Sequence, residues 1–363
     1  MKNLVKKISK IKFKLRFPNK KKILVYDNNS TNILARIIGK NFNTLMTRYE
    51  EIYLPILVLS LLINIFDTIK FKNMYFNYLK TFILVSNPYV IITFVDNDTK
   101  FYRLKKTFKK KKFIAIQNGY RFYRNDLIQK IENSSVKFIC DEYYCFGKNI
   151  EEYLKKKIYG DVINIGSIKN NLCKKLKIKK AGICFISSFG ISNNKFEKKI
   201  LNYLFNFCKD KQIKLYILPR TTGNEEKKFF ENILLKKRYI YFEKNNNFCS
   251  SYNLIDKVEL SISLNATLGY ENLSRGNKTF FLNINDRNLD CKSFLQFGYP
   301  YSFPKNGFFW SNRLIKNEFL KKINLIYKQT EAEWHLKTSK IKNKVISYEP
   351  DNLSLKKRLE NYL

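Results

Sequence analysis

The stretch ILVYDNNSTNILARIIG, residues 23–39, contains the unit on which the fold prediction rests. ILVYD is a continuous apolar run of the kind found in buried parallel strands. The polar residues after it predict a turn and a helix N-cap, and the last residues predict a helix. A strand that passes through a polar turn into a helix is half of a βαβ unit, so the stretch predicts an α/β fold with a parallel sheet.

The same unit recurs along the chain in two series. The first series continues through the strands and turns NPYVIITFVDND (87–98), FIAIQNG (113–119), VKFICDEYYCFG (136–147) and DVINIGS (161–167). The second series comprises GICFISSFG (182–190), IKLYILPR (213–220), YIYFEK (239–244) and TFFLNI (279–284), with amphipathic helices between them. We therefore predict two Rossmann-like domains that face a cleft. The expected divisions are a basic tail (1–22), a first Rossmann-like domain (23–170), a second Rossmann-like domain (171–316) and C-terminal helices (317–363).

The formal net charge is +39, from 69 Lys and Arg residues against 30 Asp and Glu residues. An excess of this size attracts anionic partners such as nucleic acid, an acidic membrane leaflet or phosphorylated substrates. The chain is also rich in Lys, Asn and Ile, the residues that AT-rich codons specify, so genome composition explains the excess equally well. Both interpretations stay open at this point, and the charge alone assigns no function.

The cysteine and histidine content restricts the chemistry. None of the seven cysteines forms a CxxC pair, and several lie in apolar runs, so we expect reduced, buried thiols with neither a disulfide framework nor a zinc site. The single histidine, His335, excludes a metal site built on several histidines and disfavours a Ser-His-Asp triad. No P-loop, GxGxxG or HExxH motif occurs.

The N-terminal region raises the question of membrane contact. The first 22 residues are basic and lack the apolar core and cleavage site of a secretory signal, so they suit either an amphipathic segment on a membrane or a solvated tail. The longest apolar run, residues 52–66, is shorter than the roughly 20 residues of a spanning helix. We expect a buried helix there, with membrane contact as the alternative. The predicted location is the cytoplasm, with attachment to the inner face of the cytoplasmic membrane as a further expectation.

Ligands of open α/β sheets bind at the carboxyl ends of the strands, and this rule selects candidate site residues. In the first series it selects Asp27, Asp96, Asn97, Asp98, Gln117, Asn118, Gly119 and Arg121. In the second series it selects Ser187, Ser188, Gly190, Arg220, Ser263, Thr267, Gly269 and Glu271. The two sets are the predicted walls of the cleft.

The segment SLNATLGYENLSRG, residues 263–276, is the most informative of these strand ends. Amides and hydroxyls at a helix N-terminus bind anions, and the groups offered to a nucleotide phosphate belong to Ser263, Asn265, Thr267 and Gly269. Glu271 is placed to accept hydrogen bonds from a ribose or sugar hydroxyl. An ordinary helix N-cap explains the same residues. Arg220 suits a bidentate phosphate contact, and equally a surface arginine at a strand end.

Two carboxylates are candidates for a catalytic role, Asp96 first and Asp27 second, as general base on an acceptor hydroxyl or as nucleophile or electrostatic partner at the anomeric carbon. Each of them also fits a plain turn or N-cap residue. The sequence Asp-Asn-Asp at 96–98 is a DxD motif by spelling only, and no metal site is expected. The basic run around residues 105–112 is interpreted as a solvated helix face in preference to a nucleic-acid or acidic-lipid contact.

Five segments, in order, resemble a bacterial family of surface-carbohydrate (O-antigen type) biosynthesis proteins, GT-B-like sugar transferases. They are ILVYD (23–27), FVDNDTKFYRLKK (94–106), FIAIQNGYR (113–121), NATLGYENLSRGNKTFF (265–281) and FGYPYSFPKNGFFW (297–310). QNGYR and TLGYENLSRGNK are the more specific of them. Ser-Leu-Asn-Ala-Thr stands where the family has a Ser-Thr pair, which leaves open whether Ser263 or Asn265 contacts phosphate.

The resemblance implies a GT-B-like fold and a CMP- or UDP-linked nucleotide sugar as co-substrate, with no cofactor. It carries over Ser263, Thr267, Gly269 and Glu271 as donor contacts and Gln117, Asn118 and Arg121 as cleft residues. Together with the strand-end residues, the predicted donor set is Ser188, Gly190, Arg220, Ser263, Asn265, Thr267, Gly269 and Glu271. The predicted acceptor set is Asn97, Gln117, Asn118, Gly119 and Arg121.

The resulting hypothesis is a metal-independent glycosyltransferase that moves a sugar onto a lipid-linked or growing glycan of a lipopolysaccharide, O-antigen or capsule. Expected partners are the nucleotide sugar, the glycan acceptor and an anionic lipid surface, but not nucleic acid. The alternatives are a nucleotide-sugar epimerase of the same fold, which a single histidine disfavours, a basic nucleic-acid-binding protein, for which no signature occurs, and an inactive scaffold.

Overall fold

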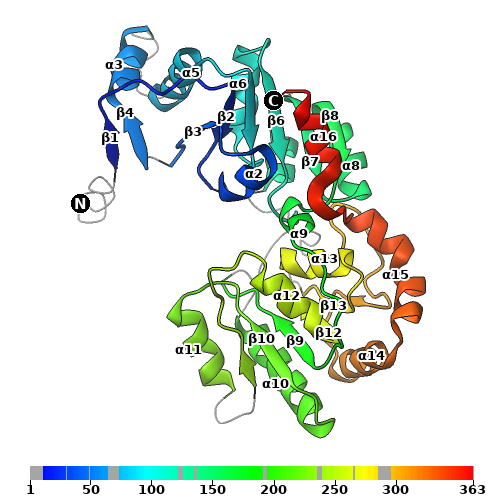
Figure 1. The fold of residues 1–363 in the computed structure, drawn as a ribbon. Helices are drawn as coiled ribbons and strands as arrows, with labels where there is room; N and C mark the ends of the chain where they lie inside the picture. Colours follow the sequence, from blue (N-terminus) through cyan, green and yellow to red (C-terminus); the bar gives the residue numbers. More distant parts are fainter. Residues whose placement is uncertain are drawn as a thin grey trace.

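The computed structural model describes residues 11–29, 31–48, 50–63, 73–121, 126–134, 137–190, 194–234, 239–264, 266–284 and 296–362 (Figure 1). Within these residues the chain forms two six-stranded parallel sheets, covered by helices, and one two-stranded pair. The predicted α/β class, with two Rossmann-like domains facing a cleft and helices at the C-terminus, is confirmed. Asn265 lies outside the described residues, so its predicted phosphate contact stays a prediction.

The first sheet has the strand order β3-β2-β5-β6-β7-β8, and each neighbouring pair is parallel. Its strands are β2 (Ile23–Tyr26), β3 (Asn43–Leu45), β5 (Val90–Thr93), β6 (Lys112–Ile116), β7 (Phe138–Cys145) and β8 (Ile158–Asn164). Strands β2 and β5 are buried at every residue, because helices cover both faces of the sheet. The helices of this unit are α2 (Thr31–Ile38), α5 (Met74–Ser86), α6 (Thr99–Thr107), α7 (Leu127–Glu132) and α8 (Lys148–Lys155).

The second sheet has the order β11-β10-β9-β12-β13-β14, again parallel throughout. Its strands are β9 (Ile183–Ile186), β10 (Leu215–Leu218), β11 (Ile240–Tyr241), β12 (Leu260–Ser263), β13 (Thr279–Leu282) and β14 (Trp310–Ser311). Its helices are α10 (Asn194–Asp210), α11 (Asn224–Ile233), α12 (Ser250–Lys257) and α13 (Thr267–Ser274). The chain runs outward from β9 in one direction and from β12 in the other, so the strand order reverses between these two strands.

The C-terminal helices join the two units. Helices α14 (Lys316–Lys328) and α15 (Glu331–Val345) follow the second sheet, and the short helix η1 (Pro350–Asn352) and α16 (Leu353–Glu360) return to the first (Figure 1). Leu355 and Leu359 are buried in the same apolar cluster as Ile33 and Leu34 of α2. Because this packing removes apolar surface from water, it holds the end of the chain on the first unit.

The N-terminal region differs from its prediction. Strand β1 (Lys12–Lys14) lies within the expected basic tail and pairs in parallel with β4 (Glu51–Tyr53), which leads directly into α3 (Leu54–Ile63). The prediction of a buried helix in the apolar run 52–66 is wrong for α3, since only Ile56 and Ser60 of this helix are buried. Among the described residues α3 packs on α5 and also contacts β4, while Val58, Leu61, Leu62 and Ile63 remain exposed. Residues 64–66 lie outside the described residues.

The cysteine prediction is corrected at one pair. Cys173 and Cys249 form a disulfide bond, with their Cα atoms 5.6 Å apart and a sequence separation of 76 positions. Cys173 follows α9 (Ile168–Leu172) in the linker between the sheets, and Cys249 precedes α12, so packing of the linker on the second unit brings them together. Cys140, Cys145, Cys184 and Cys208 are free and buried, as expected.

The prediction that the basic run at residues 105–112 is a solvated helix face is corrected for one residue. Lys105 is buried on α6, where its Nζ atom donates to the carbonyls of Lys109 and Lys111 and pairs with Asp141 at 2.7 Å. This lysine therefore stabilises the turn between α6 and β6. Lys106, Lys109 and Lys110 are exposed and fit the predicted solvated face.

Candidate functional site

A cavity of about 600 Å³ lies outside the carboxyl ends of β9 and β12, where the strand order of the second sheet reverses. This is the place at which doubly wound sheets bind their ligands. The second unit contributes most of the wall: Ile186, Ser187, Ser188, Pro219, Arg220, Lys244, Phe248, Ser251, Tyr252, Ala266, Thr267, Leu268 and Glu271. Ile33 and Asn118 come from the first unit and Lys169 from the linker, so both units and the linker line the cavity. Figure 1 shows α9, α12 and α13, which carry part of this lining, close together.

The predicted loop QNGYR meets the predicted helix TLGYE at this junction. The Thr267 hydroxyl accepts a hydrogen bond of 3.0 Å from the backbone N–H of Tyr120. The rings of Tyr120 and Tyr270 stack with their centroids 3.4 Å apart, and a Cβ on Gly119 would lie 3.3 Å from the Thr267 hydroxyl. Two segments about 150 residues apart in sequence therefore form one wall, and Asn118 is held at the edge of the cavity.

Three cations line the cavity. Arg220 is exposed, and its Nη1 donates to the carbonyl of Phe189 at 2.8 Å. Lys244 donates to the carbonyl of Arg220 at 2.7 Å, and burial lowers the pKa of its ammonium group. Lys169 extends from α9 on the opposite side. With the open N-terminus of α13 beside them, these groups make the cavity suited to a phosphate group.

Glu226 fixes the loop that carries Arg220. This carboxylate is fully buried and accepts hydrogen bonds from the backbone N–H groups of Arg220 (2.8 Å) and Thr221 (2.7 Å) and from the Thr221 hydroxyl. Glu197 has the same relation to the loop after β9, since it accepts from the backbone N–H of Ser188 at 2.9 Å. Both carboxylates therefore fix backbone groups of the loops that follow β9 and β10.

Glu271 is the one carboxylate among the described residues that line the cavity. It accepts a hydrogen bond of 2.5 Å from the Ser167 hydroxyl, which belongs to the linker, and another from Tyr252. Burial raises the pKa of Glu271, while these hydrogen bonds and the charges of Lys169 and Arg275 oppose the rise. The arrangement leaves Glu271 as a hydrogen-bond acceptor on the floor of the cavity.

The raised pKa of Glu271 predicts a pH-dependent stability. The folded protein binds this proton more tightly than the unfolded chain, so its contribution is fully present below the ordinary value of 4.5 and is lost as the pH rises through the folded-state pKa. Glu271→Gln carries no ionisable group and should remove this loss. Thermal unfolding midpoints measured from pH 4 to pH 7 (about the range of carboxylate titration) compare the two proteins. An equal decline in the variant would contradict the assignment.

Asp96, the first catalytic candidate, does not line the cavity. Its side chain is fully buried beneath the 117–121 loop, where it forms an ion pair with Arg121 and accepts hydrogen bonds from the Tyr143 hydroxyl and from the N–H of Asn118. In this structure Asp96 holds the loop in position and lies outside the cavity wall, and its predicted catalytic role stays a prediction.

The remaining first-unit candidates also have structural partners. Arg121 pairs with Asp126 at 2.9 Å as well as with Asp96, so its guanidinium is not offered to an acceptor. Gln117 bridges its own loop, donating to the carbonyl of Gly119 and accepting from the N–H of Phe146. Asn97 and Gly119 are partly exposed, but neither lines the cavity.

Asp27, the second catalytic candidate, stabilises a loop. It has a positive φ of 79°, is 3% exposed and accepts hydrogen bonds from the N–H of Asn29, the hydroxyl of Thr47 and the Nε of Arg48. These bonds join the end of β2 to the segment after β3. Like Asp96, Asp27 lies away from the cavity wall.

The donor candidates divide into two groups. Ser188, Arg220, Thr267 and Glu271 line the cavity. Ser263 and Gly269 lie behind its wall, because α13 packs so closely on β12 that a Cβ on Gly269 would lie 2.2 Å from the Ser263 hydroxyl oxygen. Gly190 is exposed beside Arg220 and shapes the loop after β9 without lining the cavity.

Sequence reasoning missed Lys169, Lys244, Phe248 and Tyr252. Lys244 ends the predicted strand YIYFEK, so the strand-end rule applied to β11 would have found it. Lys169 and Tyr252 lie in helices, and no local pattern separates them from the many other lysines and tyrosines. Arg36 of α2 stacks on Phe248 at 5.2 Å, which places a residue of the first unit over the rim of the cavity.

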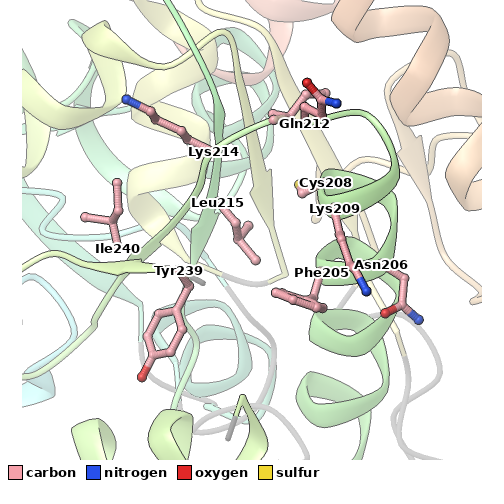
Figure 2. A pocket seen from close by; sticks show the side chains of 10 residues that line it. Phe205, Asn206, Cys208, Lys209, Gln212, Lys214, Leu215, Tyr239 and Ile240 are labelled. Atoms are coloured by element: carbon pink, nitrogen blue, oxygen red, sulfur yellow. The ribbon is translucent and has the colours of Figure 1, made fainter. Parts of the chain in front are cut away.

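A larger cavity, of about 940 Å³, lies elsewhere in the second unit (Figure 2). It is lined from α10 by Phe205 and Lys209 and from the start of β10 by Lys214 and Leu215. These residues stand at the amino end of the sheet, opposite the end at which ligands bind. Among the described residues no cluster of three or more His, Cys, Asp or Glu side chains is arranged to hold a metal ion.

Comparison with solved structures establishes a shared fold. The MnaA protein of S. aureus, solved with UDP, matches with a TM-score of 0.56 and 12% identity over 94% of this chain and 95% of that one. The UDP-GlcNAc 2-epimerase of Methanocaldococcus jannaschii matches with a TM-score of 0.53 and 11% identity over 93% of this chain and 99% of that one. A chain of the GtfA/B complex matches with a TM-score of 0.48 and 11% identity over 79% of this chain. This chain spans only 60% of the length of that matched chain.

No curated protein matches the sequence. A family described as "putative O-antigen biosynthesis protein" matches residues 114–200 and 192–363, more than half of the chain. The matched residues include the QNGYR loop, the TLGYE helix and the greater part of the cavity wall. The chain therefore belongs to this O-antigen biosynthesis family.

Proposed function

We propose that the chain is a glycosyltransferase that moves a sugar from a nucleotide sugar to a glycan during O-antigen synthesis. The observation that supports this most strongly is the cavity at the carboxyl ends of β9 and β12, with three cations, a helix N-terminus and a buried carboxylate around it. Solved neighbours of the same fold were determined with UDP or UDP-GlcNAc. Membership of the O-antigen family supports a glycan as the acceptor.

In this proposal the second unit binds the donor. Arg220, Lys244 and the amides that begin α13 offset the negative charge that develops on the leaving phosphate. The Thr267 hydroxyl lies at the same helix start. Glu271 accepts hydrogen bonds from hydroxyls of the ribose or the sugar, and its partners Ser167 and Tyr252 hold it in place. In this proposal the charge on the leaving phosphate is stabilised by amide dipoles and by cationic side chains of the protein.

The first unit covers the donor in the same proposal. Ile33 and Asn118 face the cavity from that side, and the stacked pair Tyr120–Tyr270 keeps the two walls together. Excluding water favours transfer to an acceptor hydroxyl over hydrolysis. The acceptor, a lipid-linked or growing glycan, enters from the first unit.

An epimerase is the second candidate function. Solved structures of UDP-GlcNAc 2-epimerases share the fold with TM-scores of 0.50 and 0.53. Such chemistry needs acid and base groups around the sugar, whereas Glu271 is the one carboxylate among the described residues of the cavity wall. Incubation with UDP-GlcNAc alone separates the candidates: an epimerised or released sugar without acceptor supports the epimerase.

A thermal-shift panel tests the proposed function. Purified protein is heated with CMP, CDP, UDP, GDP or dTDP, or with their sugars. A ligand at 100 times its dissociation constant adds about 2.7 kcal/mol of stability, so the correct nucleotide should raise the melting temperature by several degrees. A selective shift identifies the donor class. The absence of a shift with every nucleotide and nucleotide sugar would count against a donor site in this cavity.

A further inference from the structure

Helix α3 has an exposed apolar surface. Its sequence, LPILVLSLLI, contains no charged residue, and Val58, Leu62 and Ile63 are 55%, 65% and 57% exposed. Of the eighteen exposed large hydrophobic side chains in the described part of the chain, eight lie between residues 13 and 74. A concentration of this kind on one end of a protein marks a contact surface, whereas scattered apolar residues do not.

Strand β1 and the three residues after it add a second apolar row. Phe13, Leu15 and Phe17 are 52%, 82% and 52% exposed, and they alternate with basic residues in the sequence KFKLRF, residues 12–17. The strand pairs with β4, and β4 runs directly into α3, so the two apolar groups adjoin. Figure 1 shows β1, β4 and α3 together at the outer end of the first unit, away from the second sheet.

The charge around this surface is mainly positive. Residues 1–22 contain ten Lys and Arg residues and no Asp or Glu. Within the described part, Lys12, Arg16, Lys20 and Lys22 are exposed, while Lys14 pairs with Glu51 at 3.4 Å. A basic border around an apolar surface complements an anionic bilayer, in which phosphates surround an apolar interior. Two copies of this surface facing each other would bring the same positive charges together, which opposes self-association.

The length of α3 decides how it would meet a bilayer. Ten residues span about 15 Å, half of the roughly 30 Å hydrocarbon core. No helix in the described part of the chain is long and apolar enough to cross a membrane. A helix of ten residues is too short to span the core, so contact between α3 and a bilayer would be limited to the headgroup region and the adjoining ends of the acyl chains.

We propose that Phe13, Leu15, Phe17, Val58, Leu62 and Ile63 form a docking surface that binds an anionic lipid bilayer. The apolar side chains enter the headgroup region, and Lys12, Arg16, Lys20 and Lys22 contact lipid phosphates. Bilayer binding by this surface does not depend on the proposed function. Its role does rest on that function, because docking would place the first unit beside an acceptor carried on a lipid.

Vesicle flotation with the full chain tests the docking surface. Binding is compared between vesicles of phosphatidylcholine alone and vesicles with about one-third phosphatidylglycerol. We expect binding about tenfold or more stronger on the anionic vesicles, and weaker binding as salt is raised. The double variant Val58→Asp, Leu62→Asp should lose about tenfold or more of that binding, because two charges would enter the headgroup region. Leu336→Asp, on α15 and 82% exposed, is the matched control and should bind as the unchanged chain does.

The outcomes are separable. Equal binding by the double variant and the unchanged chain, or no binding to anionic vesicles, would overturn the docking surface. Self-association that the double variant abolishes would assign the surface to contacts between copies and overturn the proposal as well. The same variant should keep the nucleotide-induced thermal shift, since its substitutions are remote from the cavity. A missing shift in both proteins counts against the proposed function and leaves the vesicle result to be judged on its own.

Discussion

Replacing Arg275 with alanine should lower the free energy of unfolding by about 3–5 kcal/mol, because it leaves a buried charge without its partner. Arg275 follows α13, and its Nη2 pairs with Asp256 at 2.6 Å, where both side chains are fully buried. The Nε atom donates to the other oxygen of the same carboxylate at 2.9 Å. A bidentate pair of this geometry is among the stronger ones in proteins.

The same guanidinium also holds the linker between the two units. It donates to the carbonyls of Asn170, Cys173 and Lys174, at 3.4, 2.8 and 3.0 Å. Truncation would remove one donor from each carbonyl. Those of Asn170 and Cys173 keep a second donor, the N–H of Cys173 and the hydroxyl of Tyr348, so the lost bonds add modestly to the cost of the broken ion pair. The expected loss therefore includes weaker attachment of α9, which carries Lys169 to the cavity.

Chemical denaturation measures this effect. Arg103→Ala is the control, since Arg103 is exposed on α6 and contacts only the ring of Phe76 among the interactions described, so its loss should stay within about 1 kcal/mol. The double variant Arg275→Ala, Asp256→Ala removes both charges and should lose less than the sum of the single variants. Strictly additive losses would show that the two side chains do not act as a pair.

Replacing Arg220 with methionine should weaken binding of the donor about 10- to 150-fold, which corresponds to the 1.5–3 kcal/mol of a hydrogen bond to a charged group. The fold should survive, because the side chain is exposed and its one described hydrogen bond is to the carbonyl of Phe189. The backbone N–H of the residue, which Glu226 holds, is unchanged by the substitution.

The comparison uses the nucleotide that produces the thermal shift, with dissociation constants measured by calorimetry. Lys214→Met removes a cation of the other cavity in the second unit and should leave the affinity unchanged (Figure 2). Loss of affinity in both variants would indicate general attraction to the positive charge of the chain. An unchanged affinity in Arg220→Met would place the phosphate elsewhere.

Candidate residues at strand ends were predictable to different degrees in the two units. In the second unit, Ser188, Arg220 and Thr267 follow strands and line the cavity, because the carboxyl ends of parallel strands meet at one edge. In the first unit, Asp96 and Arg121 also follow strands, but they neutralise each other beneath a loop. The rule places a residue at the correct edge of the sheet, but it does not predict whether the side chain forms an ion pair with a neighbouring residue.

The sequence by itself determined the class of fold and the family, because strands such as residues 23–26 and 183–186 are consecutive apolar runs followed by polar turns. Only the tertiary structure decided which polar residues are available. Asp96 pairs with Arg121, Ser167 meets Glu271, and Tyr120 stacks on Tyr270 across 25, 104 and 150 residues of sequence. Contacts over such separations depend on how two sheets and a linker pack together, and no local periodicity records that packing.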